Sequence, residues 1–174
     1  MENRKIRKNK TNALRRAARA VVCALLAGAL AVGLSACKSG SGTNGKTPAP
    51  ADITAKVQQQ VKFDEMEEIT AQRLSRFYTV DSSAVSQMSL YVSTSLASSD
   101  ELAVFVGKSA SDAAKIKAAV QARLQKRNAD FNGYNAVQYA KLQKSVLEVR
   151  GNYVFFAVCS DPAKAKSAFD SFFA

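Results

Sequence analysis

The stretch that decides the fold is VLEVRGNYVFFAVC, residues 146–159, in which two apolar runs flank Gly151 and Asn152. A two-residue loop that starts with glycine is typical of a type II′ turn, whose twist matches that of paired strands. The stretch therefore predicts a β-hairpin with strands over 146–150 and 153–159. Asp161 and Pro162 follow at once, and an aspartate cap before a first-turn proline predicts a helix. Its core-facing residues are expected to be Ala165, Phe169 and Phe172.

A second hairpin is predicted upstream, over residues 87–106. Met88, Leu90 and Val92 alternate with Ser89, Tyr91 and Ser93, a pattern that predicts a strand with one face in water. Residues 95–101 read as a turn, and 102–106 as a second, more apolar strand. Antiparallel pairing of the two strands is expected.

Helical spacing of apolar residues predicts four further helices, over 52–62, 66–78, 109–130 and 137–144. Together with the two hairpins they indicate an α+β fold. We expect a two-layer domain, residues 53–174, in which an antiparallel sheet of about four strands is covered by helices on one face.

Three groups of residues in this body match those of a known family. They are Asp100 to Ala103 before the second strand, Phe131 with Tyr134 after the long helix, and Gly151 to Phe156 in the last hairpin. On these residues the body resembles a family of small bacterial lipoproteins, catalogued as a domain of unknown function and common in Gram-positive gut anaerobes. Asn135-Ala136 stands where the family has a proline. The resemblance brings no activity, ligand or catalytic residue.

The N-terminal residues are typical of an exported leader. Residues 1–19 carry eight basic side chains against Glu2, and the 15 residues of 20–34 carry no charge. Because a spanning helix needs roughly 20 apolar residues, this run fits a cleavable signal, with an uncleaved signal anchor as the alternative. The quartet Leu34, Ser35, Ala36 and Cys37 resembles the signal-peptidase recognition sequence of bacterial lipoproteins. The resemblance implies removal of residues 1–36, acylation of Cys37, and anchoring by membrane lipid on the extracytoplasmic face of the cell membrane.

The formal charge of +11 belongs largely to the leader. Without residues 1–36 the chain has seventeen basic and thirteen acidic residues, or +4, which does not indicate a nucleic-acid partner. Residues 37–52 read as the lipidated cysteine and a flexible tether of Gly, Ser and Pro. Gly40 to Thr47 matches the phosphate-loop pattern, but no strand leads into it and Pro48 and Pro50 follow it. We therefore expect no nucleotide.

The chain has no histidine, which excludes Ser-His and Cys-His catalysis and removes the commonest metal ligand. No catalytic residue, metal or cofactor is predicted. An acidic patch is typical of a solvated helix start, although folding could bring two carboxylates together as an acid and base; its members are Asp64, Glu65, Glu67 and Glu68. Cys159 ends an apolar run and is predicted to be a buried structural cysteine.

Two surfaces are candidates for binding. The first is basic and would meet anionic lipid or wall polymers; its members are Lys115, Lys117, Arg123, Lys126, Arg127, Lys141, Lys144 and Arg150. The second would bind a peptide or glycan, and consists of Tyr91, Asp100, Glu101, Tyr134 and Tyr153 with the polar face of the strand at 89–93. A solvated helix face and ordinary cross-strand pairing explain the same residues.

These observations favour a binding or accessory module of the cell envelope, which meets an envelope protein or a wall polymer. A small envelope hydrolase that uses a carboxylate pair is one alternative, and a structural or assembly protein that contacts other membrane proteins is another. Two close carboxylates in a cleft would favour the hydrolase. An exposed apolar patch would favour a protein partner.

Overall fold

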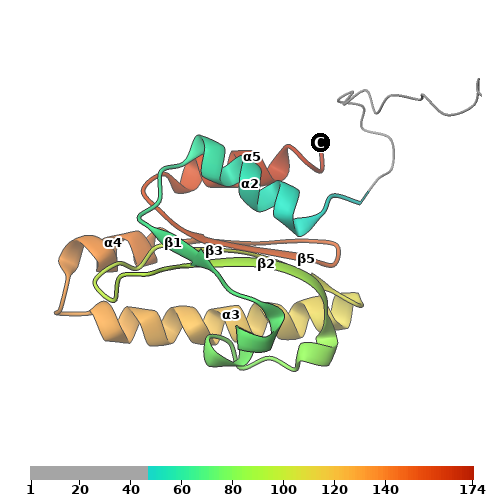
Figure 1. Ribbon diagram of the computed structural model, residues 1–174, viewed down its shortest axis with the longest axis horizontal. Coiled ribbons are helices and arrows are strands. Elements are labelled where there is room, and N and C mark those ends of the chain that lie inside the picture. Colours follow the sequence, from blue (N-terminus) through green and yellow to red (C-terminus); the bar gives the residue numbers. More distant parts are fainter. Residues whose placement is uncertain (1–46) are drawn as a thin grey trace, which may run out of the picture. The chain divides into compact units, whose positions relative to one another are not determined.

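The computed structural model describes residues 47–174. Within them an antiparallel sheet of five strands has the order β1-β2-β3-β5-β4 (Figure 1). The strands are β1 (Met66–Glu68), β2 (Val85–Ser93), β3 (Glu101–Gly107), β4 (Val146–Arg150) and β5 (Tyr153–Val158). The helices are α2 (Pro50–Gln60), α3 (Ala110–Phe131), α4 (Ala136–Gln143) and α5 (Pro162–Asp170), with 3₁₀ helices η1 (Ala71–Arg76) and η2 (Ser82–Ala84). The α+β class and the antiparallel sheet are as predicted, with a fifth strand added.

The hairpin around Gly151 forms as predicted. Arg150 pairs with Tyr153, so the loop contains two residues. Gly151 has φ +55°, and Asn152 lacks a positive φ, as a type II′ turn requires. The hairpin places β5 between β4 and β3, so that β5 and β3 occupy the centre of the sheet.

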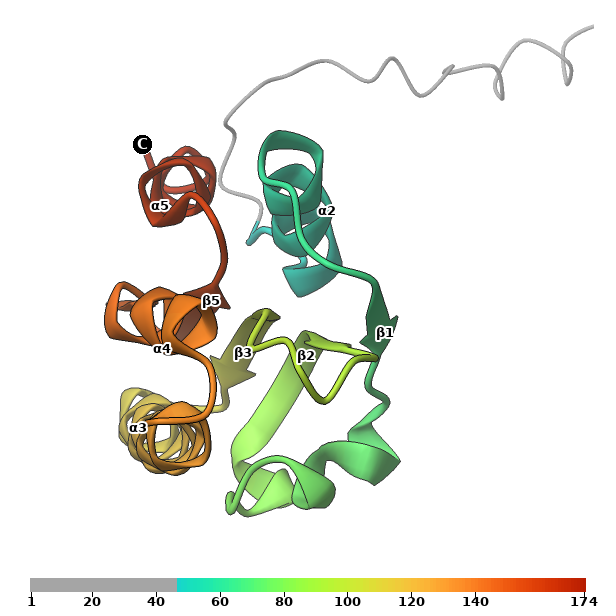
Figure 2. The same ribbon diagram turned by 90° about the vertical axis from the view of Figure 1, so that its left-hand side faces the viewer.

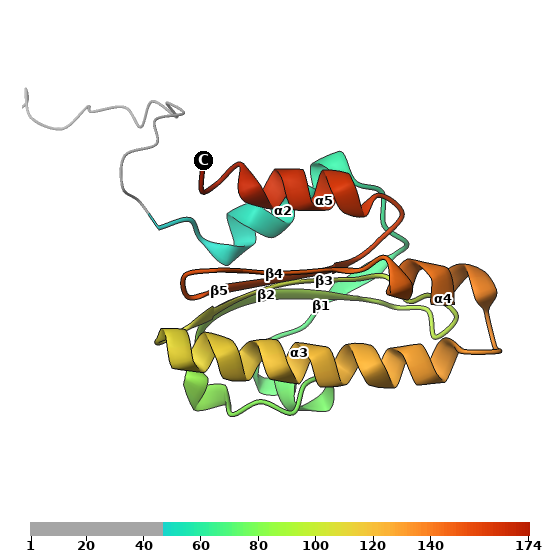
Figure 3. The same cartoon turned by 180° about the vertical axis from the view of Figure 1, so that it is seen from behind.

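The central strands are apolar on both faces. In β3, Ala103 and Phe105 join one buried cluster, whereas Leu102 and Val104 join another. β5 divides its side chains in the same way. Two apolar faces both need cover, and Figures 1 and 3 show α2 and α5 on one side of the sheet and the long α3 on the other. The expectation of helices on one face is therefore wrong, and the sheet lies between two helical layers.

Helices α2 and α5 lie side by side on one face of the sheet (Figure 2). Ile53 and Val57 of α2 are completely buried against this face. The ring of Phe169 in α5 stacks on that of Phe155 in β5, with centroids 4.6 Å apart. Complete burial of each such side chain contributes about 1.5–3 kcal/mol. Asp161 caps α5 by accepting from the Lys164 amide, as the sequence predicts.

Helix α3 covers the other face. Ser109 caps it by accepting from the Asp112 amide, and Ile116 and Val120 are buried on its inner stripe. Leu124 is partly buried against the same cluster. The start of α3 lies so close to β3 that a Cβ on Gly107 would be 2.6 Å from the Ala113 nitrogen. Gly107 therefore permits the close approach of helix and sheet.

The helix predicted over Met66–Tyr78 is wrong. Met66–Glu68 instead forms β1, which pairs with Tyr91–Ser93 at the end of β2. The Ile69 amide then donates to the Leu90 carbonyl at 2.8 Å, and the chain leaves the sheet to form η1. Ile69 and Leu74 are both buried, so a strand end and a 3₁₀ turn together bury the residues whose spacing suggested one helix.

Several element ends differ slightly from the prediction. Helix α2 begins at Pro50, which occupies its first turn, rather than at Asp52. Asn135 caps α4 by accepting from the Gln138 amide. The predicted signal peptide, Cys37 and the phosphate-loop match up to Lys46 lie outside the described residues.

None of the helices in residues 47–174 has the length and apolar character needed to cross a membrane.

Candidate functional site

A buried ion pair stands where β3 begins. Glu101 is 2% exposed, and its carboxylate accepts from the Nε of Arg123 at 2.6 and 2.9 Å. The hydroxyl of Tyr78 donates to the same carboxylate. Burial raises the pKa of Tyr78 well above its ordinary value, and the charge of Glu101 raises it further. The phenol therefore remains protonated and serves as a donor.

Asp100, the residue before Glu101, has its own cation. Its Oδ1 lies 2.7 Å from the Nζ of Lys141 in α4, and its Oδ2 accepts from the Asp64 amide at 2.9 Å. Lys141 also lies 3.8 Å from Asp64 Oδ2, which accepts from the Ser98 hydroxyl at 2.5 Å. Lys141 of α4 thus bridges Asp64 and Asp100. These contacts fix the β2–β3 turn against α4.

The remaining acids of the predicted patch are dispersed. Glu67 in β1 pairs with Arg73 in η1 at 3.0 Å, whereas Glu68 is exposed and has no ion pair among the described residues. Within residues 47–174 no three His, Cys, Asp or Glu side chains are grouped so as to hold a metal ion. The acids of this region thus pair with basic side chains or stand apart.

The five residues predicted to form one binding surface do not come together. Asp100 and Glu101 are buried in their ion pairs. Tyr134 is 70% exposed between α3 and α4. Tyr153 is paired with Val106 at the far end of β3 and donates to the Pro48 carbonyl at 2.7 Å. Tyr91 is half-buried on the face that α2 covers, where neighbouring Ser89 contacts Thr54 of α2 instead of water.

Three residues of the predicted basic surface form ion pairs that join separate elements. Arg123 pairs with Glu101 and Lys141 with Asp100 in the buried region. Arg150 pairs with Asp170 of α5, on the opposite face of the sheet from α3. Two other members, Lys117 and Lys144, are exposed and have no ion pair among the described residues.

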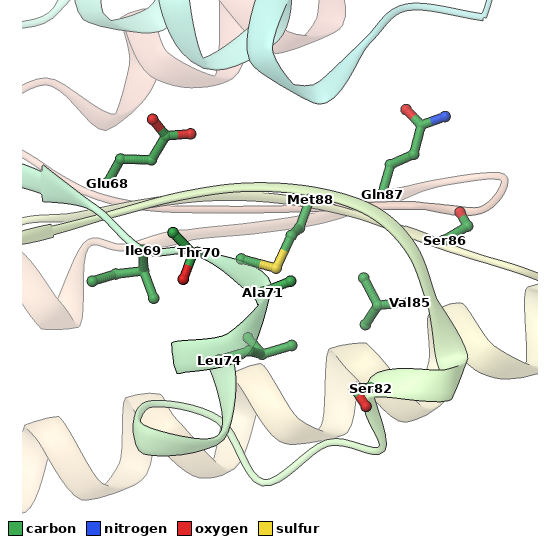
Figure 4. Close-up of a pocket in the computed structure, with 10 residues that line it drawn as sticks. All are labelled: Glu68, Ile69, Thr70, Ala71, Leu74, Ser82, Val85, Ser86, Gln87 and Met88. Atoms are coloured by element: carbon green, nitrogen blue, oxygen red, sulfur yellow. The ribbon is translucent and has the colours of Figure 1, made fainter.

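A groove of about 330 Å³ opens where the chain leaves the sheet after β1 (Figure 4). Its floor is apolar and consists of Ile69 and Leu74 on one side and Val85 and Met88 on the other. Figure 4 shows Glu68 and Gln87 pointing to the opposite side of the sheet from this floor. The groove therefore has a mainly apolar floor, with Ser82 on the same side, and its charged residue Glu68 lies across the plane of the sheet with Gln87.

The groove follows an unpaired edge of β2. Strand β1 pairs with Tyr91–Ser93, and among the described residues no strand continues its line beside 85–89. The Leu90 carbonyl points toward this edge, because it accepts from the Ile69 amide. Backbone groups alternate along a strand, so the amide and carbonyl of Met88 point to the same edge. Strand β1 does not extend far enough along β2 to pair with the amide and carbonyl of Met88.

The strands, the ion pairs and the groove lie in a part of the chain that matches a known protein family. Residues 59–159 match the family described as Domain of unknown function (DUF4358). The chain belongs to this family. The DUF4358 region begins near the end of α2 and ends at Cys159, so it includes all five strands, the buried ion pairs and both walls of the groove. No curated protein and no solved structure matches the chain.

A second groove of about 360 Å³ lies within the same DUF4358 region, apart from one residue of α2. Its lining includes Asp64 and Tyr91 together with Val61, Phe63 and Met66. It brings together two residues that the sequence singled out, one from the acidic patch and one from the predicted binding surface. Each of the two grooves has a single carboxylate in its lining, Glu68 in the first and Asp64 in the second.

Sequence reasoning missed the groove beside β2 because it assigned 66–78 to a helix. One signal was available. Residues 85–89 read Val-Ser-Gln-Met-Ser and carry no charge, whereas a sheet edge that faces water usually carries charged side chains.

Proposed function

We propose that this DUF4358 protein is a lipoprotein anchored through Cys37 on the extracytoplasmic face of the cell membrane, and that its body is a binding module. The binding site is the groove between β1, η1 and the free edge of β2. The single observation that carries the binding role is the coincidence of a concave apolar floor with an unpaired strand edge. Concave apolar sites with a few polar groups are the usual form of binding sites.

The order of segments along the chain supports the anchor. A charged and then apolar leader precedes Leu34 to Cys37, and Pro48 is fixed to the body by the Tyr153 hydroxyl eleven residues after Cys37. The intervening residues are rich in Gly, Ser and Thr, the composition of a flexible spacer. Two or more acyl chains on Cys37 would hold the chain at the membrane, since one chain alone binds only marginally.

The environment of the acids favours binding over hydrolysis. A carboxylate pair acts as acid and base when the environments of its two members differ enough to give them different roles. Asp64 and Asp100 are bridged by Lys141, and Glu101 is paired with Arg123. The carboxylate-pair hydrolase therefore gains no support from these acids.

An assembly role has one observation in its favour. Leu96 in the β2–β3 turn is 94% exposed and Val137 in α4 is 69% exposed. Ser99 and Gln138 tie these segments together through a hydrogen bond of 2.8 Å. These two side chains lie on segments that are held together, and a continuous exposed apolar patch marks a protein contact site, so contact with an envelope protein is the second candidate.

Protease treatment of wall-free cells tests the location of the body. The sequence places Lys38 and Lys46 between Cys37 and the first described residue, so external trypsin is expected to release a soluble fragment that begins at Ser39 or Thr47. A chain with Lys38→Gln and Lys46→Gln should remain on the cells. Release that occurs only after the cells are lysed would contradict an extracytoplasmic body.

A further inference from the structure

We infer that the groove takes up an extended peptide segment of a partner protein, which adds to β2 as a strand in the line of β1. Its side chains would alternate, with apolar residues toward Ile69 and Leu74 and a basic residue toward Glu68. The inference rests on the proposed role as a binding module and names the chemistry of its ligand.

The edge of β2 beside Met88 offers hydrogen-bonding groups to an added strand. The amide and carbonyl of Met88 point away from β3 and have no strand opposite them in residues 47–174. Peptide backbone supplies a donor and an acceptor at the spacing of a strand, and strand addition to an exposed edge is a general mode of peptide binding. The Ile69 amide already donates to the Leu90 carbonyl, so the peptide would continue the row of hydrogen bonds that begins between β1 and β2.

The two edges of the sheet differ in the charge of their side chains. On β4 the outward edge carries Glu148 and Arg150, which pair with Lys166 and Asp170 of α5. Charged side chains of this kind protect an edge from further pairing. The free edge of β2 has no charged residue from Val85 to Ser89. This edge is open, whereas the other is protected.

The residues that line the groove lie on both sides of the plane of the sheet (Figure 4). Successive side chains of a strand point to opposite faces. An added strand would therefore direct every second side chain onto the apolar floor of Ile69, Leu74 and Met88, and the others toward Glu68 and Gln87 (Figure 4). A ligand with alternating apolar and polar residues fits both faces.

The charge of Glu68 specifies the ligand further. Glu68 is the single charged residue in the groove lining, is exposed, and forms no ion pair among the described residues. The peptide would follow Glu68 in the same line beside β2, where an opposite charge is attracted to the carboxylate and a like charge is repelled. A lysine or arginine on the polar face of the peptide is therefore favoured.

The experiment is peptide selection on the full chain, purified in detergent, with a phage-displayed library of random peptides about ten residues long. Selected peptides are expected to alternate apolar and polar residues and to contain Lys or Arg. Their affinity is then compared between Met88→Pro and Met88→Ala chains. Both lack the methionine side chain, but only proline removes the outward amide. Binding to Met88→Pro should be about tenfold weaker than to Met88→Ala, the effect of an unsatisfied hydrogen bond.

Proline is tolerated at sheet edges because its missing amide is not needed there, and circular dichroism will show whether the Met88→Pro chain is folded. Hydrogen exchange on the unsubstituted chain gives a second readout that needs no variant. Addition of a selected peptide should slow exchange at the Met88 amide. Glu68→Gln should remove the preference for basic residues in a repeated selection.

Four results would overturn the inference. They are the absence of any enriched peptide, equal binding by folded Met88→Pro and Met88→Ala chains, protection by peptide that spares Met88, and a concentration-dependent dimer that protects Met88 without peptide. The last would assign the edge to a second copy of this chain. Failure of the anchor is seen separately, because a chain that binds these peptides but carries no lipid on Cys37 refutes the membrane role alone.

Discussion

The single Nε–H of Arg123 is shared between the two carboxylate oxygens of Glu101, with nitrogen–oxygen distances of 2.6 and 2.9 Å, although the two residues are 22 positions apart in sequence. Glu101 opens β3 and Arg123 lies in the second half of α3, so the pair fixes the long helix to one end of the sheet. Its side chains are 2% and 12% exposed. Two charges so far from water are stable only as a pair.

Replacement of Arg123 is therefore expected to be severe. Arg123→Met leaves Glu101 buried without its cation, and loss of one partner of a buried pair costs about 3–5 kcal/mol. Urea denaturation followed by circular dichroism measures the loss. Lys126→Met is the matched control on the same helix, since its exposed pair with Asp130 is worth at most about 0.5 kcal/mol. A loss below about 1 kcal/mol for Arg123→Met would show that the pair does not hold the fold together.

Gly107 gives a prediction about the contact between β3 and α3. Gly107→Ala places a methyl group 2.6 Å from the Ala113 nitrogen and 3.0 Å from the Ser109 carbonyl oxygen, both backbone atoms. The start of the helix must move, at a cost of about 1–3 kcal/mol. Gly133→Asn is the control, because that position has φ +76° and no neighbour within 4 Å, and asparagine tolerates this conformation. Equal stability of Gly107→Ala and the unsubstituted chain, measured by thermal unfolding, would refute the close approach.

Cys159 is buried at the end of β5, as the sequence predicts. Burial raises the pKa of its thiol to about 11, and a thiol reacts as its thiolate. Iodoacetamide at pH 8 should therefore label Cys159 slowly in the folded chain and rapidly in urea. The measurement uses a chain with Cys23→Ser and Cys37→Ala, so that Cys159 is the single thiol. Rapid labelling of the folded chain would contradict its burial.

The same thiol makes stability depend on pH. The fold favours the neutral form, so this contribution is complete below the unfolded pKa near 9 and is lost as pH rises toward 11. The free energy of unfolding should fall more steeply over this interval than in a Cys159→Ala chain. Identical slopes would mean that the folded state does not disfavour the thiolate.

Local signals in the sequence were sufficient for much of the fold. The turn at Gly151 and the helix cap at Asp161 depend on residues within a few positions of one another, and both form as predicted. The second helical layer was missed although 102–106 and 153–158 are continuous apolar runs. Such runs are typical of strands buried on both faces, so that signal was present.

Other features depend on contacts that sequence spacing does not reveal. β1 is three residues long and exists through its pairing with Tyr91–Ser93. Asp100 and Glu101 are buried, although the sequence placed them in a candidate binding surface. Their cations, Lys141 and Arg123, come from helices that follow later in the chain. The groove beside β2 likewise exists because the chain leaves the sheet at Ile69, which no local pattern indicates.

The anchor is the central claim of this account, and the intact mass of protein extracted from native membranes tests it most directly. The mass should equal that of residues 37–174 plus a diacylglyceryl group on the sulfur of Cys37, which carries two acyl chains. A Cys37→Ala chain should carry no acyl mass and should retain residues 1–36. A full-length chain without lipid in the unsubstituted protein would contradict the anchor and return the eight basic residues of the leader to the functional protein.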